Sequence, residues 1–488
     1  MKYLPITVLF FILNFDCYAA KHLNNTILSP NEASAFVDYL FRNYSAAQPG
    51  ASIIVIKNGE IELVKSYGYG DLENNILSTP QTNYRIASVT KQFTAMAIML
   101  LVNQGKLTYQ TNLKELFPEF PLYGKDITIE QLLTHRSGLV NYNRFLKAGQ
   151  TEQMLDKDVL NGLMKTDSTY FKPNTKYAYC NSSYAVMAQI VAKLSRLSFA
   201  DFMQKEIFQP LEMTNSMVYE KDKAIKNRAY GYVVKDTSII FKDQSLYSAI
   251  QGDGGIYSSV MDYYKWDQAL YTDKLLPLNK LDAAFYNYDE HGKSEVKGYG
   301  YGWKVDYYKG IKILQHGGSS IGFGSHVIRI PSENISVAIF TNRSKKGQEL
   351  ANSAKALISH YTNGKFQMPF QIVLEKEIEQ NGINSGIKMY NQIKTDTVNY
   401  SWSKEALFNF GISYINNNKS AEALKIFSCL ASDYPNYFGG YYGSAVIYEK
   451  EKNTKKAIKY CNLTIKYCTE NQEWASVHSK KMIAALTK

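Results

Sequence analysis

The sequence predicts an α+β protein in which both ends of a first domain form one antiparallel sheet, with flanking helices, a large helical insertion and an all-α domain after it. Strand-like segments cluster at 51–67 and again at 300–341, and the residues between them carry mainly helix and loop patterns. Strands at both ends of one domain can pair in a single sheet, with the helical insertion beside it. After Lys365 the composition changes and helical patterns continue to the end of the chain.

The first element expected in the folded domain is a helix that begins at Ser29-Pro30-Asn31-Glu32 and runs to about Tyr44. The serine caps the helix, the proline occupies its first turn, and the glutamate completes a capping box. Two β-rich runs follow, at Ala51–Lys57 and Glu60–Tyr67. The Asn58-Gly59 pair between them is a strong signal for a two-residue hairpin turn.

The next element is an apolar helix that follows Ser88-Val89-Thr90-Lys91. The run from Phe93 to Val102 leaves almost no polar face, which predicts a buried helix. Ser88 and Lys91 are three residues apart, so their side chains share one helix face. Burial and the positive end of the helix dipole both lower the pKa of such a lysine. A neutral Lys91 could then accept the proton of Ser88 and turn it into a nucleophile.

The segments that follow alternate between helices and loops until strand patterns return near residue 300. They are the loop Leu132-Leu133-Thr134-His135-Arg136-Ser137-Gly138-Leu139, the segment Tyr179-Cys180-Asn181, a helix over Val186–Leu194, a glycine turn at Gly252–Gly255, strands at Gly300–Asp306, Lys312–Gln315, Gly324–Ile330 and Ile335–Thr341, and a helix over Glu349–Tyr361. We expect His135 to make a structural hydrogen bond in its loop, Asp253 to be a turn residue and His326 to pack in the sheet.

The C-terminal part, residues 371–488, contains a repeat with a period of 34 residues over 404–470. Gly411 corresponds to Ala445, Tyr414 to Tyr448, Ala423 to Ala457 and Phe427 to Cys461. This period is typical of tetratricopeptide helix pairs. An earlier pair, Glu375–Gln380 and Gly386–Lys394, resembles a degenerate unit, which would give the roughly three units that a stacked core needs. A generic helical bundle is the alternative. Two roles are open for the tail: it binds a protein partner, or it only covers the catalytic domain.

Residues 1–20 read as a secretory signal peptide, with Lys2 before the apolar run Leu4–Phe15 and small residues after it. We therefore expect a periplasmic or secreted protein, with no membrane-spanning segment in the mature chain. A lipoprotein anchored through Cys17 is disfavoured, because Asp16 fits that motif poorly. The net charge of +11 forms no dense basic block, so nucleic acid is not an expected partner. The cysteine spacings suggest no metal site, and we expect no cofactor.

Three stretches together resemble the serine β-lactamase/penicillin-binding-protein superfamily, and most of all class C β-lactamases and the D,D-peptidases and esterases related to them. They are Ser88-x-x-Lys91, Tyr179-x-Asn181 and His316-Gly317-Gly318. The 132–139 loop and the Gly254-Gly255 turn agree with it. The resemblance covers about residues 28–362.

The resemblance implies a role for each of these residues. Ser88 becomes acylated, and Lys91 and Tyr179 share the work of the general base. Asn181 hydrogen-bonds the substrate amide and Lys91. His316, Gly317 and Gly318 bind substrate along their strand. The backbone N–H groups of Ser88 and Ser319 form the oxyanion hole, and no metal takes part.

Histidine at position 316 departs from the Lys-Thr-Gly of β-lactamases and is more typical of D,D-peptidases and D-aminopeptidases in the superfamily. A neutral imidazole is a weaker anchor for a carboxylate than an ammonium. The sequence therefore predicts a serine hydrolase that acts on a small-molecule or peptide substrate, with D-amino-acid peptides of the peptidoglycan type favoured. The alternatives are an esterase or weak β-lactamase on the same site, and a catalytically quiet scaffold whose repeat tail recruits a partner.

Overall fold

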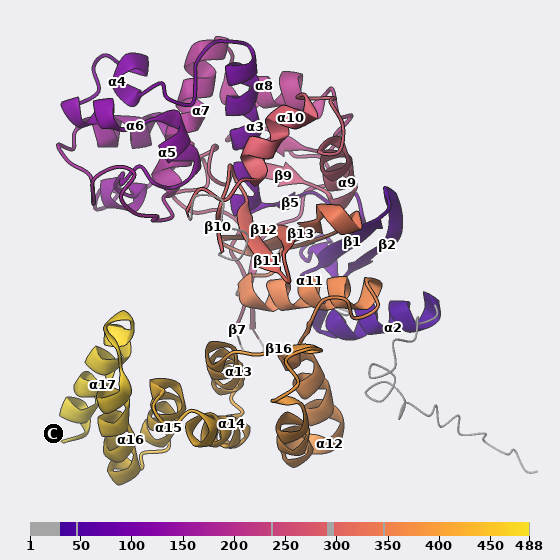
Figure 1. Cartoon of the computed structure of the whole chain (residues 1–488), viewed down its shortest axis with the longest axis vertical. Helices are drawn as coiled ribbons and strands as arrows, with labels where there is room; N and C mark the ends of the chain where they lie inside the picture. The colour runs from indigo at the N-terminus through magenta and orange to yellow at the C-terminus, as the bar shows by residue number, and fades with distance from the viewer. Residues whose placement is uncertain (1–29, 45–46, 236–237, 290–296, 345–346, 488) are drawn as a thin grey trace, which may run out of the picture. The chain divides into compact units, whose positions relative to one another are not determined.

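The computed structural model describes residues 30–44, 47–235, 238–289, 297–344 and 347–487. The predicted signal peptide and the Ser29 cap lie outside these residues. The chain divides into two compact units (Figure 1). Val37–Ile358 forms the first, and the rest of the described chain forms the second.

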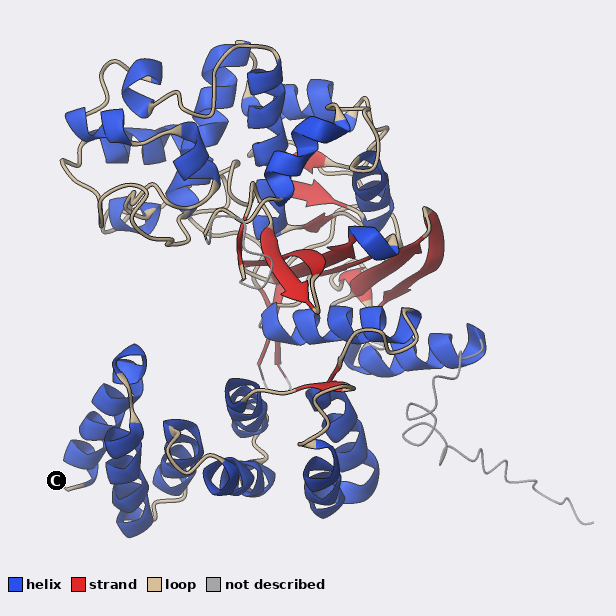
Figure 2. Cartoon of the chain, viewed as in Figure 1, coloured by secondary structure: helices blue, strands red, loops and turns tan. Residues whose placement is uncertain are grey.

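Seven antiparallel strands form the main sheet of the first unit, in the order β10-β11-β12-β13-β14-β1-β2 (Figure 2). Their bounds are β10 (Gly298–Tyr299), β11 (Lys304–Tyr308), β12 (Ile311–Ser320), β13 (Phe323–Ile330), β14 (Ile335–Thr341), β1 (Ala51–Lys57) and β2 (Glu60–Tyr67). β1 pairs with β14 from Ala51↔Thr341 to Lys57↔Ile335. The two ends of the unit therefore pair within one sheet, as the predicted fold class requires.

The strands follow the sequence pattern closely, with two differences. Asn58 and Gly59 both have positive φ, 54° and 83°, as the predicted hairpin turn demands. The prediction of a single strand at Gly300–Asp306 is wrong, because Gly302 turns the chain with a φ of 77° and separates β10 from β11. β12 is longer than predicted, since pairing with β13 keeps its glycine- and serine-rich end extended through Ser320↔Phe323.

Helices cover the sheet and form the predicted insertion. They are α2 (Pro30–Leu40), α3 (Thr90–Asn103), α4 (Leu113–Leu116), α5 (Ile129–Leu133), α6 (Asp156–Met164), α7 (Asn181–Ser195), α8 (Phe199–Met203), α9 (Val260–Ala269), α10 (Leu278–Leu281) and α11 (Gly347–Tyr361). Short strands accompany them: β3 (Tyr69–Asp71), β4 (Ile76–Leu77), β5 (Tyr84–Arg85), β6 (Met217–Val218), β7 (Tyr232–Lys235), β8 (Ser238–Phe241) and β9 (Ile256–Ser258). The first helix ends at Leu40, and a separate 3-10 turn over Arg42–Tyr44 replaces its predicted last turn.

α3 is the central helix of the first unit. Every residue from Thr90 to Leu101 is buried, as the apolar sequence predicts. The Phe93 ring stacks on Trp266 with centroids 4.0 Å apart and meets the edge of Phe208 at 6.0 Å. A helix that is buried on all sides is held in one position, so the side chains on its first turn, including Lys91, are held in place as well.

The second unit is mostly helical. Its elements are β15 (Met368–Pro369), α12 (Phe370–Ile393), β16 (Tyr400–Ser401), α13 (Lys404–Asn416), α14 (Ser420–Asp433), α15 (Phe438–Lys450), α16 (Thr454–Tyr467) and α17 (Glu473–Leu486). Gly382, with φ 80° and ψ 169°, breaks α12 into the two helices that the sequence predicts there. α13 and α15 begin at residues 404 and 438, and α14 and α16 begin at 420 and 454, which are two spacings of 34. The tetratricopeptide type itself stays a prediction.

Candidate active site

Ser88 lies in a short 3-10 turn that begins at Ala87 and leads directly into α3. Ile86 anchors the start of this turn from two sides. Its N–H donates to the Ile256 carbonyl at 3.0 Å, and its carbonyl accepts from Ser325 Oγ at 2.7 Å. Ala87 has a φ of +48°, a left-handed conformation that costs an alanine about 1–2 kcal/mol. Such strain persists only where the surroundings impose it, so the fold holds Ser88 in one place.

β12 passes close to this turn, and Gly318 makes the approach possible. A Cβ on Gly318 would overlap the Ile86 carbonyl oxygen and Ser325 Oγ. β13 pairs with β12 along this stretch, whereas β11 pairs with it only as far as Gln315. Beyond Gln315, the edge of β12 that faces away from β13 therefore has no pairing with β11. This open edge lies next to Ser88. Such an edge can pair with an extended peptide, and Ser319 is exposed there.

Lys91 lies one turn after Ser88 and is fully buried. Its Nζ donates to Ser88 Oγ at 3.1 Å and to the Asp253 carbonyl at 2.8 Å. Burial lowers the pKa of Lys91 to about 8, because the ammonium loses its hydration there. The geometry expected from the Ser-x-x-Lys spacing is present, and the amine is partly neutral near pH 7.

Tyr179 reaches Ser88 from the loop before α7. Its side chain lies close enough to Ser88 for the two to interact, and Lys91 Nζ lies 5.0 Å from the centroid of its ring. Burial raises the pKa of Tyr179 well above its usual value. The phenol therefore keeps its proton at neutral pH. Of Ser88, Lys91 and Tyr179, Lys91 is the group that loses a proton most readily.

His135 holds the loop that carries Tyr179. Its Nδ1 accepts the Cys180 N–H at 3.1 Å, and its carbonyl accepts the Ala178 N–H at 3.0 Å. The imidazole ring lies 4.2 Å from the Tyr179 ring, centroid to centroid. Burial lowers the pKa of His135 well below its usual value, so the ring is neutral and Nδ1 can accept. The expected structural hydrogen bond of His135 is confirmed.

Asn181 is the first residue of α7, and its N–H donates to Asn141 Oδ1 at 3.1 Å. The predicted hydrogen bond between Asn181 and Lys91 is absent from the described structure, in which Lys91 Nζ donates to Ser88 and to the Asp253 carbonyl. Asn181 Oδ1 is buried without a hydrogen-bond partner among the described residues. Its role toward a substrate amide stays a prediction.

His316 lies on β12 with 1% of its surface exposed. The Tyr299 hydroxyl and Nε2 are 2.9 Å apart, and Nδ1 and the Gly317 carbonyl are 2.8 Å apart. Burial lowers the pKa of His316 well below its usual value, and the nearby Lys91 charge adds to this. A neutral ring donates from Nδ1 and accepts from the phenol at Nε2. A direct contact between His316 and substrate, which stays a prediction, needs one of these hydrogen bonds to break.

Residues that the sequence did not assign complete the site. Asp253 lies in the expected turn, yet its carbonyl is the second acceptor for Lys91 and its carboxylate accepts the Tyr142 hydroxyl at 2.9 Å. Asp156, from α6, holds that turn through the Gln251 N–H at 2.8 Å. Burial raises the pKa of Asp156 to about 7. Nothing in a single sequence indicates that Asp156 contacts the backbone at Gln251. The Gly252–Gly255 turn, by contrast, could have suggested a backbone acceptor for Lys91.

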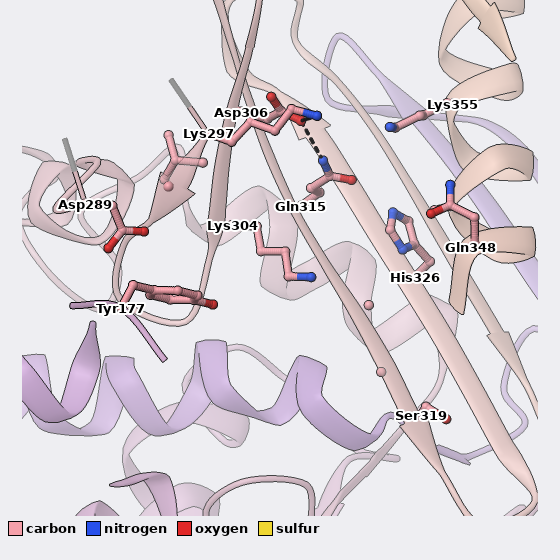
Figure 3. Close-up of a pocket in the computed structure, with 15 residues that line it drawn as sticks. Tyr177, Asp289, Lys297, Lys304, Asp306, Gln315, Ser319, His326, Gln348 and Lys355 are labelled. Carbon is pink, nitrogen blue, oxygen red and sulfur yellow. Dashed lines mark hydrogen bonds and ion pairs between the residues drawn. The ribbon is translucent and has the colours of Figure 1, made fainter. Parts of the chain in front are cut away.

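A cavity of about 610 Å³ adjoins the open edge of β12 (Figure 3). Residues that line it include Tyr177, Lys304, Gly317, Ser319, His326 and Lys355. His326 does lie in the sheet, but it also faces this cavity, and neither of its ring nitrogens has a partner within the described chain. Packing in the sheet is therefore only part of its environment.

The described residues contain no group of three or more His, Cys, Asp and Glu side chains that could hold a metal ion. Cys180, Cys429, Cys461 and Cys468 are free thiols. Among the helices that the structure describes, none is long and apolar enough to cross a bilayer.

The fold, with the buried Lys91 between the partly buried Ser88 and Tyr179, is that of a hydrolase domain of the serine type. The chain belongs to the beta-lactamase family, whose family model matches residues 37–361. It is 30% identical to Penicillin-binding protein 4* of Bacillus subtilis, over 67% of this chain and 74% of that protein. It is 25% identical to Protein flp of Staphylococcus aureus, over 60% of this chain and 59% of that one.

Solved structures agree with the family. The octameric penicillin-binding protein homologue from Pyrococcus abyssi matches with a TM-score of 0.61 and 26% identity, over 72% of this chain and 82% of that one. The penicillin binding protein from Bacillus halodurans matches with a TM-score of 0.58 and 25% identity, over 66% and 98%. D-amino acid amidase from Ochrobactrum anthropi shares the fold, with a TM-score of 0.56 and 20% identity, over 69% and 97%.

Proposed function

We propose that this protein is an exported serine hydrolase that forms an acyl-enzyme on Ser88 and cleaves peptides, amides or esters, with D-amino-acid peptides favoured. The observation that carries the proposal is the 3.1 Å contact between Ser88 Oγ and the fully buried Nζ of Lys91. A buried amine with a pKa of about 8 can accept a proton near neutral pH, which an exposed lysine cannot do efficiently.

In the acylation step, neutral Lys91 accepts the Ser88 hydroxyl proton while Oγ forms a bond to the substrate carbonyl carbon. The backbone N–H groups of Ser88 and Ser319 stabilise the oxyanion that forms, and loss of one such donor typically costs about 10²–10³ in rate. As the bond to the leaving group breaks, the proton returns from Lys91 through the Tyr179 hydroxyl to the leaving nitrogen or oxygen. Tyr179 suits this relay because it stays protonated and its side chain interacts with that of Ser88.

In the deacylation step, a water molecule attacks the ester carbonyl of acylated Ser88. Tyr179 and Lys91 take the water proton and give a proton to Ser88 Oγ when its bond to the acyl carbon breaks. The enzyme then has its starting protonation again, and the product is a carboxylic acid. No metal or cofactor is needed for either step.

The substrate class is supported by the relatives and by position 316. A penicillin-binding protein and a D-amino acid amidase are among the similar proteins. His316 is neutral and uses both ring nitrogens within the protein, so it offers less to a β-lactam carboxylate than a lysine would. We therefore place efficient β-lactam hydrolysis below peptidase, amidase or esterase activity.

The direct test is mass spectrometry of the intact protein after exposure to a fluorophosphonate and to penicillin. The wild-type protein should gain one adduct, and proteolysis should map it to Ser88. Ser88→Ala should gain none, and labelling of Ser88→Ala to the wild-type extent would refute the assignment. A panel of an acyl-D-Ala-D-Ala peptide, short acyl esters and nitrocefin then separates peptidase, esterase and β-lactamase activity.

A quiet scaffold remains the alternative function, in which the helical tail recruits a protein partner. It predicts no turnover on the whole panel together with stable capture of a partner by the full chain. Turnover that depends on Ser88 would reject it. Export through the predicted signal peptide is testable by N-terminal sequencing of the protein from the cell envelope or medium.

A further inference from the structure

Side chains from two helices hold the glycine turn, residues 251–255, by hydrogen bonds. From α6, the two oxygens of the Asp156 carboxylate accept the Gln251 N–H at 2.8 Å and the Gly252 N–H at 3.1 Å. From α3, Thr94 Oγ1 donates to the Gly252 carbonyl at 2.7 Å. Both the N–H and the carbonyl of Gly252 are therefore bound by side chains, and the turn is fixed from two directions.

The two side chains that hold the turn are buried. Asp156 is 3% exposed and Thr94 is fully buried. A Cβ on Gly252 would lie 2.2 Å from the Tyr184 carbonyl oxygen, so the turn also packs tightly against α7. Burial raises the pKa of Asp156 to about 7, because a buried carboxylate loses its hydration. Buried groups with such shifts are concentrated at functional sites, which directs attention to what this turn carries.

The turn carries the acceptor of Lys91. The Asp253 carbonyl receives Lys91 Nζ at 2.8 Å. Because Asp253 directly follows Gly252, its carbonyl can move only if the contacts of Gly252 change. Lys91 and Thr94 are three residues apart on α3 and therefore share one helix face. The same helix thus presents the amine and one of the side chains that fix the position of its acceptor.

A displacement of the turn would change the protonation of Lys91. Burial lowers the pKa of Lys91 to about 8, and the Asp253 and Cys180 side chains act in the opposite direction. The Asp253 carbonyl also favours the ammonium form, because it accepts a hydrogen bond from it. If the turn moved away, both effects of Asp253 would weaken and the pKa of Lys91 would fall further. Asp156 is not among the groups that shift this pKa directly, so its influence passes through the turn.

We propose that Asp156 and Thr94 are positioning residues for the reaction at Ser88. Through the glycine turn they fix the point at which the Asp253 carbonyl meets the amine of Lys91. That contact holds the amine in place for its second contact, with Ser88 Oγ at 3.1 Å. The inference rests on the proposed function, because it takes Lys91 to be the base that activates Ser88.

The test is the pH profile of Ser88 labelling by a fluorophosphonate, on the full chain, for Asp156→Asn and Thr94→Val. Asp156→Asn keeps one acceptor oxygen and turns its amide group toward the other backbone N–H. Thr94→Val removes the hydroxyl and keeps the volume. Each should slow labelling at the high-pH plateau about tenfold, since a misplacement of about 1 Å can cost about 10²-fold. Each should also lower the midpoint by about half a pH unit or more, because the ammonium loses stabilising contacts.

Asp262→Asn is the matched control for a loss of structure alone. Asp262 is 1% exposed, and its Oδ2 accepts the N–H groups of Asn215 and Ser216 at 2.8 Å each, away from the glycine turn. Asp262→Asn should lower the melting temperature about as much as Asp156→Asn does, yet leave the plateau rate and the midpoint unchanged. The same pattern in Asp156→Asn would reduce Asp156 to a structural role.

Hydrogen exchange followed by mass spectrometry reports on the turn without any turnover. Exchange of a peptide that covers residues 248–258 should be faster in Asp156→Asn and in Thr94→Val than in the wild type, and unchanged in Asp262→Asn. If Asp156→Asn does not fold, Thr94→Val carries the same predictions for exchange, plateau and midpoint.

The outcomes separate this inference from the proposed function. Labelling of wild-type Ser88 together with an unchanged plateau and midpoint in the folded variants overturns the positioning role alone. If the wild type is not labelled, the proposed function fails, and the pH dependence of the free energy of unfolding decides. The rise in stability that accompanies the lowered pKa of Lys91 should begin at a lower pH in Thr94→Val than in the wild type, and the same onset in both overturns the inference.

Discussion

The rate at which Ser88 is acylated should rise with pH through the pKa of Lys91. Burial lowers that pKa from 10.5 to about 8, and the neutral amine is the form that accepts the serine proton. With a pKa of about 8, about 9% of Lys91 is neutral at pH 7, about 50% at pH 8 and about 91% at pH 9. The second-order rate of labelling by a fluorophosphonate should therefore rise about fivefold between pH 7 and 8 and about twofold more by pH 9.

The assay is labelling of Ser88 followed by intact-protein mass spectrometry between pH 6 and 10, within the range where the protein stays folded. Tyr179→Phe is the matched control. It removes the relay but not the base, so the rate should fall while the midpoint stays near 8. A flat profile, or a midpoint close to the ordinary lysine value, would refute the reasoning. A midpoint that moves in Tyr179→Phe would assign the titration to the phenol instead.

The remaining predictions concern how the fold maintains this site. Lys91→Met should abolish labelling of Ser88. Because the folded-state pKa of Lys91 is lowered, the unfolded chain binds more protons between pH 8 and 10.5, and the wild-type protein gains up to about 3 kcal/mol of stability as pH rises through that window. Denaturant melts at pH 7 and pH 10 measure the free energy of unfolding of Lys91→Met and of the wild type. The free energy of Lys91→Met relative to wild type should fall with pH, and a constant difference would contradict the lowered pKa of Lys91 in the folded state. Ala87→Gly should stabilise the protein by up to about 1 kcal/mol, because it removes the strain that the alanine carries at a φ of +48°, whereas Ala87→Val keeps that strain and should destabilise the protein; equal losses in both would reject backbone strain. His135→Phe leaves the Cys180 N–H without its acceptor and should cost about 1–3 kcal/mol and slow deacylation. His135 has a φ of 58°, so His135→Asn, which keeps an acceptor and tolerates positive φ, should recover part of both.

Local patterns were sufficient to predict most of the fold. The Asn58-Gly59 turn fixed the hairpin, and the apolar run after Lys91 identified the buried helix. Errors arose where a tertiary contact decides the backbone conformation. Gly302 interrupts a segment that has strand-like composition, and the end of β12 is extended because β13 pairs with it.

The same distinction between local patterns and tertiary contacts applies to the candidate active site. Ser88 and Lys91 are close in the sequence, so helix geometry was enough to place them together. The Asp253 carbonyl, the hold of His135 on the Tyr179 loop and the unpaired ring of His326 depend on contacts over long sequence distances. The absent Lys91–Asn181 bond shows the same limit, because the relative placement of the two residues is set by tertiary contacts and not by a local pattern.

The pairing of β1 with β14 has a consequence for how the protein matures. Lys57 and its partner Ile335 are separated by about 280 residues, so the sheet cannot close until nearly the whole first unit has left the ribosome. Contacts between such distant segments slow folding. The N-terminal hairpin must therefore wait for β14, and during that time the edge of β1 has no strand partner. A chain truncated before Ile335 would keep the serine and its lysine but lack the strand that joins the two ends.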